Sequence, residues 1–175
     1  MSGAPAWDRI FLDYSCSKLQ QQTERICDCL DRLGGEQIWL RDTENENAVG
    51  NLVLHLCGNV RQWIVAGLGG KPDIRQRDLE FAERSGASAD QLKARLRETV
   101  RDAATVLRGL GPDHLLERKK IQKYEMPALE AVYHVVEHFS GHAGQIIYAT
   151  KRFTGTDLGF YAHLKTPKPP KDPTP

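Results

Sequence analysis

Apolar residues recur at helical spacing along four long segments of the chain, and this repeat constrains the fold more than any other feature of the sequence. In residues 48–68 they fall at every fourth position, as Leu52, Leu56, Val60 and Ile64. Residues 88–110 contain a longer stripe, made of Leu92, Leu96, Val100, Ala103, Leu107 and Leu110. Intervals of three and four residues place such side chains on one face of a helix. Both segments are therefore predicted to be amphipathic helices.

Two further segments, residues 6–33 and 127–153, complete the set of predicted helices. The first has a less regular stripe, made of Ile10, Tyr14, Leu19, Ile26, Leu30 and Leu33. Glycine or proline follows the first three helices, as Gly34-Gly35, Gly69-Gly70 and Gly111-Pro112, and these residues are typical of helix ends. Ser88 and Gln91 have the spacing of a capping box at the start of the third helix, and Pro127 suits the first turn of the fourth.

The connecting segments favour an all-α four-helix bundle. Residues 70–87 read as a long polar loop after helix two, with a short helical piece at 77–83, and residues 112–126 as a short hairpin or an extended crossover. Connections of this length permit a bundle with crossovers. We predict one bundle domain over residues 1–160. Residues 161–175 are rich in proline and lysine and are predicted to be a flexible tail.

The composition argues against nucleic-acid and membrane functions. The formal net charge is +1, so there is no basic excess to contact phosphates. The longest apolar run, residues 63–68, is far shorter than the roughly 20 residues that span a bilayer. The N-terminal residues lack the pattern of a secretory signal. Cys16, Cys27, Cys29 and Cys57 include no CxxC pair, so we expect reduced thiols in a cytoplasmic protein.

Three of the six histidines follow one another at intervals of four residues in the fourth helix: His134, His138 and His142. Side chains at i and i+4 are neighbours on a helix, so either adjacent pair can reach one metal ion. His134 and His142 lie about 12 Å apart along the axis, so all three cannot share it. A third ligand must come from another helix, and His55 stands in an apolar stretch of helix two.

Other interpretations of these histidines exist. A lone histidine on an apolar face is commonly a hydrogen-bonded core residue. In this alternative the histidines bind no metal, and the chain is a plain helical interaction protein. Residues 134–138 also match H-x-x-E-H, the inverted zinc-protease pattern, with Glu137 as the base. That site needs a further acidic ligand downstream, and no glutamate follows Glu137. The protease reading is therefore disfavoured.

The stretches HLCGNVRQW, beginning at His55, and EHFSGHAGQIIYATK, beginning at Glu137, resemble the DinB-like (YfiT-like) superfamily. The resemblance implies a four-helix bundle with up-up-down-down topology and a divalent metal ion held by His55, His138 and His142. It also implies that the protein forms a homodimer. Some branches of the superfamily are transferases or isomerases that depend on low-molecular-weight thiols, and this chain is more similar to an uncharacterised branch.

Four further residues are expected to line the pocket or support the metal ligands: Asn59, Trp63, His134 and Gln145. Zn or Ni is the expected ion, with Fe or Mn as alternatives, and three imidazoles suit Zn, Ni, Fe or Cu. Three nitrogen ligands leave a position open, as in catalytic sites. The first hypothesis is a metal-dependent enzyme, either a thiol-dependent transferase or hydrolase-like. The second is a non-catalytic metal-binding or stress-response module. Arg75, Arg77, Asp78 and Glu80 read as a solvated run of charges, with the arginines as candidates for binding an anionic substrate.

Overall fold

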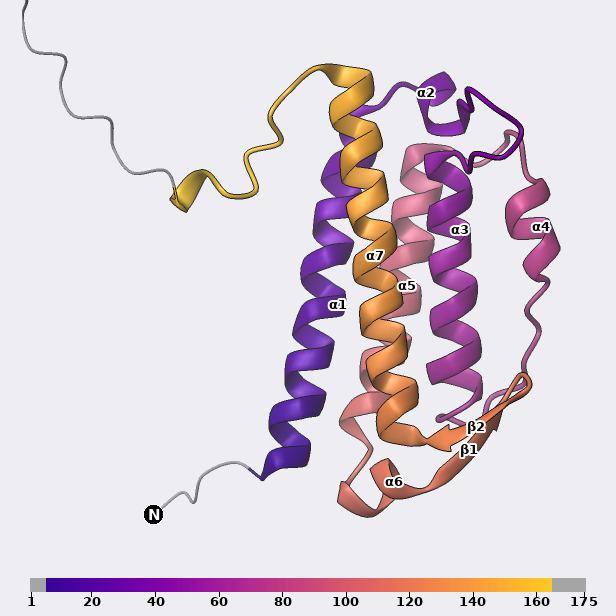
Figure 1. Cartoon of the computed structure of the whole chain (residues 1–175), viewed down its shortest axis with the longest axis vertical. Coiled ribbons are helices and arrows are strands. Elements are labelled where there is room, and N and C mark those ends of the chain that lie inside the picture. Colours follow the sequence, from indigo (N-terminus) through magenta and orange to yellow (C-terminus); the bar gives the residue numbers. More distant parts are fainter. Residues whose placement is uncertain (1–5, 165–175) are drawn as a thin grey trace, which may run out of the picture.

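Four long helices pack lengthwise in the structure, a computed structural model that describes residues 6–164 (Figure 1). They are α1 (Trp7–Arg32), α3 (Val49–Val60), α5 (Ala89–Arg108) and α7 (Ala128–Thr154). Each is within a few residues of a predicted helix, so the all-α four-helix bundle is confirmed. Among the described residues, no helix is both long and apolar enough to cross a membrane.

The connections contain short elements. These are α2 (Gly35–Trp39), α4 (Arg77–Ala82), α6 (Pro112–Leu116) and the 3-10 turn η2 (Ala162–Leu164). Strands β1 (Arg118–Ile121) and β2 (Tyr124–Pro127) form an antiparallel hairpin. The predicted helical piece near 77–83 and the hairpin alternative for 112–126 are thus confirmed. Of the predicted tail, residues 161–164 end in η2, and 165–175 lie outside the described residues.

The second predicted helix changes its winding after Val60. Residues Arg61–Ala66 form a π-helix, η1, in which the amide of Gly67 donates to the carbonyl of Gln62 at 2.9 Å. π-Helical turns are wider than α-helical turns and occur often at functional sites. This turn contains Trp63, whose ring centroid lies 6.2 Å from that of Tyr124 in the hairpin.

The directions of the helices differ from the expected up-up-down-down order. Lys93, near the start of α5, pairs with Asp31, near the end of α1, so these two helices are antiparallel. Figure 1 shows α1 and α7 running in one direction and α3 and α5 in the other, which is up-down-down-up. The physical reason is that only the segment 67–88 returns along the bundle, whereas the links 33–48 and 109–127 turn at an end.

The buried face of α1 also differs from the predicted stripe. Leu19, Ile26 and Leu30 are buried as expected, but Ile10 is 57% and Tyr14 62% exposed. The buried face of α1 also contains polar residues, so an apolar pattern in the sequence does not identify it. The hydroxyl of Thr23, which is buried, donates to the carbonyl of Leu19 at 2.8 Å and so is satisfied within its own helix.

Local signals at the other helix ends agree with the sequence. The Ser88 hydroxyl accepts from the amide of Gln91 and the Gln91 side chain accepts from the amide of Ser88, so the predicted capping box is present. Gly155 ends α7 with a positive φ of 65°, a conformation that favours glycine. All four cysteines are free and buried in the core.

Candidate metal centre

Three histidines from two helices meet between α3 and α7. His55 of α3 is buried, and its Nε2 lies 3.1 Å from Nε2 of His138 on α7. His142, one turn further along α7, has its ring centroid 4.5 Å from that of His138 and 5.1 Å from that of His55. One ligand nitrogen from each ring lies within 4.8 Å of the other two. The structure therefore brings together the three residues that the resemblance selects.

The antiparallel course of α3 and α7 explains why these residues meet. His138 and His142 are i and i+4 on one face of α7, and His55 points at that face from the neighbouring helix. Glu137 is exposed on another face of α7. The inverted zinc-protease reading, which needs Glu137 beside the histidines, is therefore not supported.

The carboxylate of Glu80 orients His55. The sequence predicted Glu80 to belong to a solvated run of charges. Glu80 on α4 is buried, and its Oε2 lies 3.0 Å from Nδ1 of His55. Arg75 donates to both carboxylate oxygens of Glu80 at 2.8 Å, and its side chain is 4% exposed. With Nδ1 engaged by Glu80, Nε2 of His55 is the nitrogen that faces the other histidines. A carboxylate on the far nitrogen of a histidine is the usual outer partner of a metal ligand.

Burial alone would raise the pKa of Glu80, but hydrogen bonds from Arg75 and His55 outweigh it and hold that pKa below its usual value. The carboxylate is therefore charged at neutral pH. It can keep the Nδ1 proton of His55 and so fix the tautomer of the ring.

Close packing of α4 against α3 holds Glu80 in place. At Gly58 a Cβ would come within 1.8 Å of Oε1 of Glu80, so only glycine leaves room for this carboxylate. The buried Asn51 side chain donates to the backbone carbonyls of Glu80 and Glu83, at 2.9 Å each. Arg41 donates to Oδ1 of Asn51 at 2.6 Å. The position of the Glu80 side chain therefore depends on contacts with residues far apart in the chain, and no local sequence pattern predicts it.

The other two histidines are neutral at physiological pH. Burial and the neighbouring His142 and His55 lower the pKa of His138 to about 3. Burial also lowers the pKa of His142, although its hydrogen bond with Gln145 opposes the shift. Oε1 of Gln145 lies 2.9 Å from Nδ1 of His142, which leaves Nε2 of that ring available. Neutral imidazoles are the form that binds a metal ion.

The remaining predicted pocket residues lie beside the three histidines. The ring of His134 packs against that of Trp63 at a tilt of 46°, with 4.4 Å between centroids, and lies 5.7 Å from the ring of His138. Three buried polar atoms here have no hydrogen-bond partner among residues 6–164: Oδ1 of Asn59, Nε1 of Trp63 and Nδ1 of His138. Buried polar groups are normally paired, so unpaired ones beside a cavity suggest that something else binds there.

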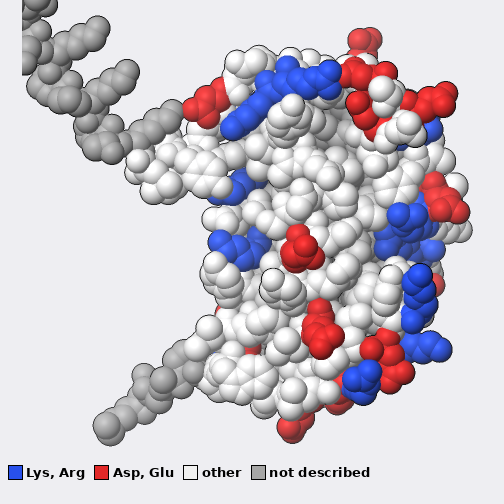
Figure 2. Space-filling model, viewed as in Figure 1, with Lys and Arg blue, Asp and Glu red and all other residues white. Residues whose placement is uncertain are grey.

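A cavity of about 690 Å³ adjoins the site. Its wall includes His55, His138 and Trp63, and the hairpin contributes Tyr124 and Met126. Its size suits a small molecule, and its mixture of aromatic, apolar and convergent polar groups is typical of a ligand site. Basic side chains gather along the edge between α4 and the hairpin and over the C-terminal end of α7 (Figure 2).

Comparisons with solved structures agree with this fold. A conserved protein from Enterococcus faecalis has a TM-score of 0.68 at 15% identity, over 82% of this chain and 97% of that chain. A DinB-like protein from Bacillus subtilis has a TM-score of 0.64 at 13% identity, over 85% of this chain and 97% of that chain. A mutant of the mycothiol-dependent maleylpyruvate isomerase has a TM-score of 0.55 at 14% identity, over 77% of this chain and 60% of that chain.

The bundle has the fold of the solved DinB-like proteins. The chain belongs to the DUF1572 family, described as proteins of unknown function, whose sequence profile matches residues 7–168. No curated protein matches the sequence.

Proposed function

We propose that the protein binds one divalent metal ion through His55, His138 and His142 and acts with it on a small molecule in the adjoining cavity. The observation that carries the proposal is the convergence of three imidazoles with the Glu80 carboxylate behind His55. Zn or Ni is the proposed ion, because imidazole ligands suit both, and Fe or Mn are the alternatives. A set of three protein ligands leaves a position for an exogenous one.

The chemistry proposed is a metal-dependent reaction of a small ligand, in which a low-molecular-weight thiol is the candidate co-substrate. A bound divalent ion would stabilise a thiolate or polarise a carbonyl group. Fold similarity to a protein named as a mycothiol-dependent isomerase supports the choice of a thiol. This chain's own residues would bind and orient the ligand: Trp63 and Tyr124 offer aromatic faces, and Asn59 offers an unpaired acceptor.

Transfer is favoured over hydrolysis by the positions of the acidic groups. Glu80 is engaged by Arg75 and His55, so it is not free to act as a base. Glu130 lines the cavity, but it lies eight residues before His138 on α7, about 12 Å along the axis. A base acting on metal-bound water would have to lie within hydrogen-bonding reach of it.

The alternative is a non-catalytic metal-binding module, in which the ion stabilises the fold or is sensed. Structural sites have four protein ligands and no open side. Here two of the three ligand histidines, His55 and His138, border a cavity large enough for a small molecule. That arrangement favours the ligand-binding proposal. The protein is proposed to form a homodimer and to act in the cytoplasm. The four free buried thiols suit a reducing compartment.

A cobalt-substituted sample tests the proposal, because its absorption spectrum reports the ligands of the ion. Glutathione and cysteine would be titrated into the Co-loaded protein. We expect a new near-ultraviolet band from sulfur coordination, absent in His138→Ala and retained in His163→Ala, a change at an exposed histidine of η2. A spectrum that no thiol alters would contradict the thiol step. Failure to take up Co²⁺ would contradict the metal site itself.

A further inference from the structure

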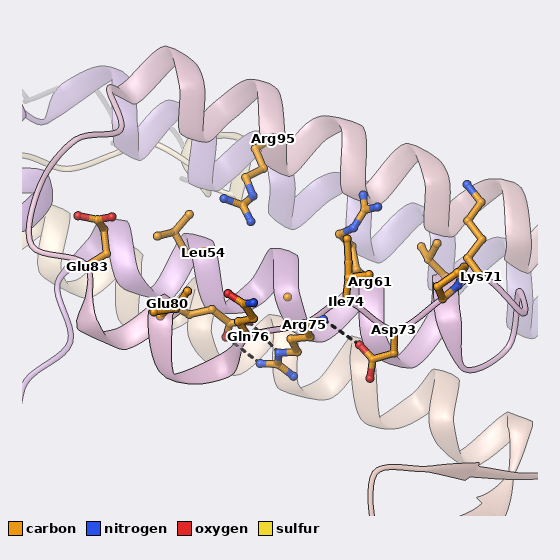
Figure 3. A pocket seen from close by; sticks show the side chains of 14 residues that line it. Leu54, Arg61, Lys71, Asp73, Ile74, Arg75, Gln76, Glu80, Glu83 and Arg95 are labelled. Atoms are coloured by element: carbon orange, nitrogen blue, oxygen red, sulfur yellow. Dashed lines mark hydrogen bonds and ion pairs between the residues drawn. The ribbon is translucent and has the colours of Figure 1, made fainter.

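A second cavity, of about 320 Å³, lies beside α4 and does not include any of the three histidines (Figure 3). Its walls come from α3, η1, the segment 71–76, α4 and one residue of α5. Arg75 borders both cavities, and Glu80 borders this one. The Arg75–Glu80 ion pair therefore lies between this cavity and the metal centre.

Four basic side chains from different parts of the chain line this second cavity. Arg61 comes from η1, Lys71 and Arg75 from the crossover, and Arg95 from α5. Figure 3 shows Arg95 reaching from α5 toward α3, while Arg61 and Lys71 point toward α5 from the opposite side. Cations that converge in a concave site from several segments are a common arrangement for binding an anion.

The carboxylates in the same lining are already engaged. Glu80 is paired with Arg75 at 2.8 Å. Asp73 accepts from the Gln62 side chain at 2.7 Å and from the Arg75 amide at 3.0 Å. The third carboxylate, that of Glu83, accepts from backbone amides of the two residues that follow it, at 3.0 and 3.1 Å.

The lining has four basic and three acidic side chains, so its formal positive charge exceeds the negative by one. Within the described part of the chain, no carboxylate forms an ion pair with Lys71 or with Arg95. Arg61 has only Asp102, at 3.8 Å. Such a distance in a partly exposed pair contributes little.

Apolar side chains complete the cavity. Leu54 and Val65 are buried in its wall, whereas Ile74 is 75% and Leu79 61% exposed at its rim. Exposed apolar groups next to cations that have no close ion pair favour a ligand that has both an anionic group and an apolar part.

We propose that this cavity binds a small organic anion, a carboxylate or phosphate attached to an apolar group. Arg61, Lys71 and Arg95 hold the anionic group, because a guanidinium or ammonium group donates charge-assisted hydrogen bonds to its oxygens. Ile74 and Leu79 cover the apolar part. The site does not depend on the metal ion or on the function proposed for it.

Titration of the full-length protein with hexanoate, hexyl phosphate, hexanol and inorganic phosphate tests this assignment. Binding is followed through the methyl NMR signals of Ile74 and Leu79, with and without a chelator. We expect hexanoate, hexyl phosphate or both to shift these signals equally in the two conditions. We expect hexanol and inorganic phosphate to bind at least ~10-fold more weakly. Hexanol lacks the anionic group, and inorganic phosphate lacks the apolar part. Binding of only one organic anion would identify its anionic group.

A double variant, Lys71→Ala with Arg95→Ala, should weaken the better ligand ~10-fold or more, since two charge-assisted contacts are lost. Neither side chain has an ion pair, so the fold should be unaffected. The control is Lys120→Ala with Arg101→Ala, which removes the same charge from exposed positions outside the cavity and should bind as the wild type does. Equal binding of inorganic phosphate and hexyl phosphate would reveal an adventitious anion only, and unchanged affinity in the first variant would overturn the assignment. Metal content is measured separately, so a failure of the anion site can be told apart from a failure of the metal site.

Discussion

The contact of α7 with α1 and its contact with α3 differ in how their buried polar groups are hydrogen-bonded. Toward α1, the hydroxyl of Thr150 donates to the carbonyl of Ile146 at 2.8 Å, and the Thr23 hydroxyl is satisfied in the same way within α1. One buried atom on this side, Oε1 of Gln22, lacks a partner among residues 6–164. Toward α3, Oδ1 of Asn59, Nε1 of Trp63 and Nδ1 of His138 lack a partner in the part of the chain that the structure describes. The first contact is built for stability. The second leaves polar groups available beside a cavity, at a cost to stability.

Truncation of Phe139 to alanine should have the largest effect, because this fully buried ring packs in the core. We expect the free energy of unfolding to fall by ~3–5 kcal/mol, measured by urea denaturation. Tyr148→Ala, on the exposed side of the same helix, is the matched control and should change it by less than about 0.5 kcal/mol. Equal effects of the two changes would show that the α7 core is not packed as described.

Glu80→Gln should act on the side of α7 that holds the histidines. It removes the charge that orients His55, so metal affinity should fall ~10–100-fold in a competition assay with a chelating dye. Glu83→Gln, at the exposed end of the same short helix, should leave the affinity unchanged. A Glu80 variant with the affinity of the wild type would show that this carboxylate does not support the site.

Thr150→Val probes a satisfied polar group on the α1 side. The variant loses the hydroxyl that donates to Ile146 and interacts with Cys29. We expect a loss of ~1 kcal/mol in the free energy of unfolding, the usual worth of a buried hydrogen bond. An increase in stability would remove the distinction between the two sides of α7.

Asn59→Leu probes an unsatisfied group on the α3 side and should have the smallest effect. Its side-chain oxygen has no partner to lose within residues 6–164, and leucine is close in shape. Thermal denaturation of the metal-free variant should therefore show a change of no more than about 0.5 kcal/mol, or a gain in stability. A loss as large as that of Thr150→Val would mean that Asn59 is structural.

The sequence predicts what local spacing determines. The helices, the Ser88 cap and the i, i+4 pair of His138 and His142 all depend on neighbours within one turn. The long-range meeting of His55 with this pair was expected from the family resemblance, but the role of Glu80 was missed. Glu80 reaches His55 only because α4 docks where Gly58 leaves room, which depends on how the long crossover folds back.

The remaining differences have the same origin. The direction of the helices depends on which link returns along the bundle, and loops of similar length permit either order. On α1, hydroxyl groups that are satisfied within the helix made its buried face look polar, so Ile10 and Tyr14 were assigned to the core although they are exposed.

Elemental analysis of the untagged protein, purified beside His55→Ala, His138→Ala and His163→Ala, tests the central claim most directly. We expect about one Zn, Ni, Fe or Mn ion per chain in the wild type and in His163→Ala, and almost none in the other two variants, because the ligands come from both α3 and α7. A wild-type protein that contains no metal, even after incubation with each ion, would contradict the claim. So would full occupancy in either ligand variant.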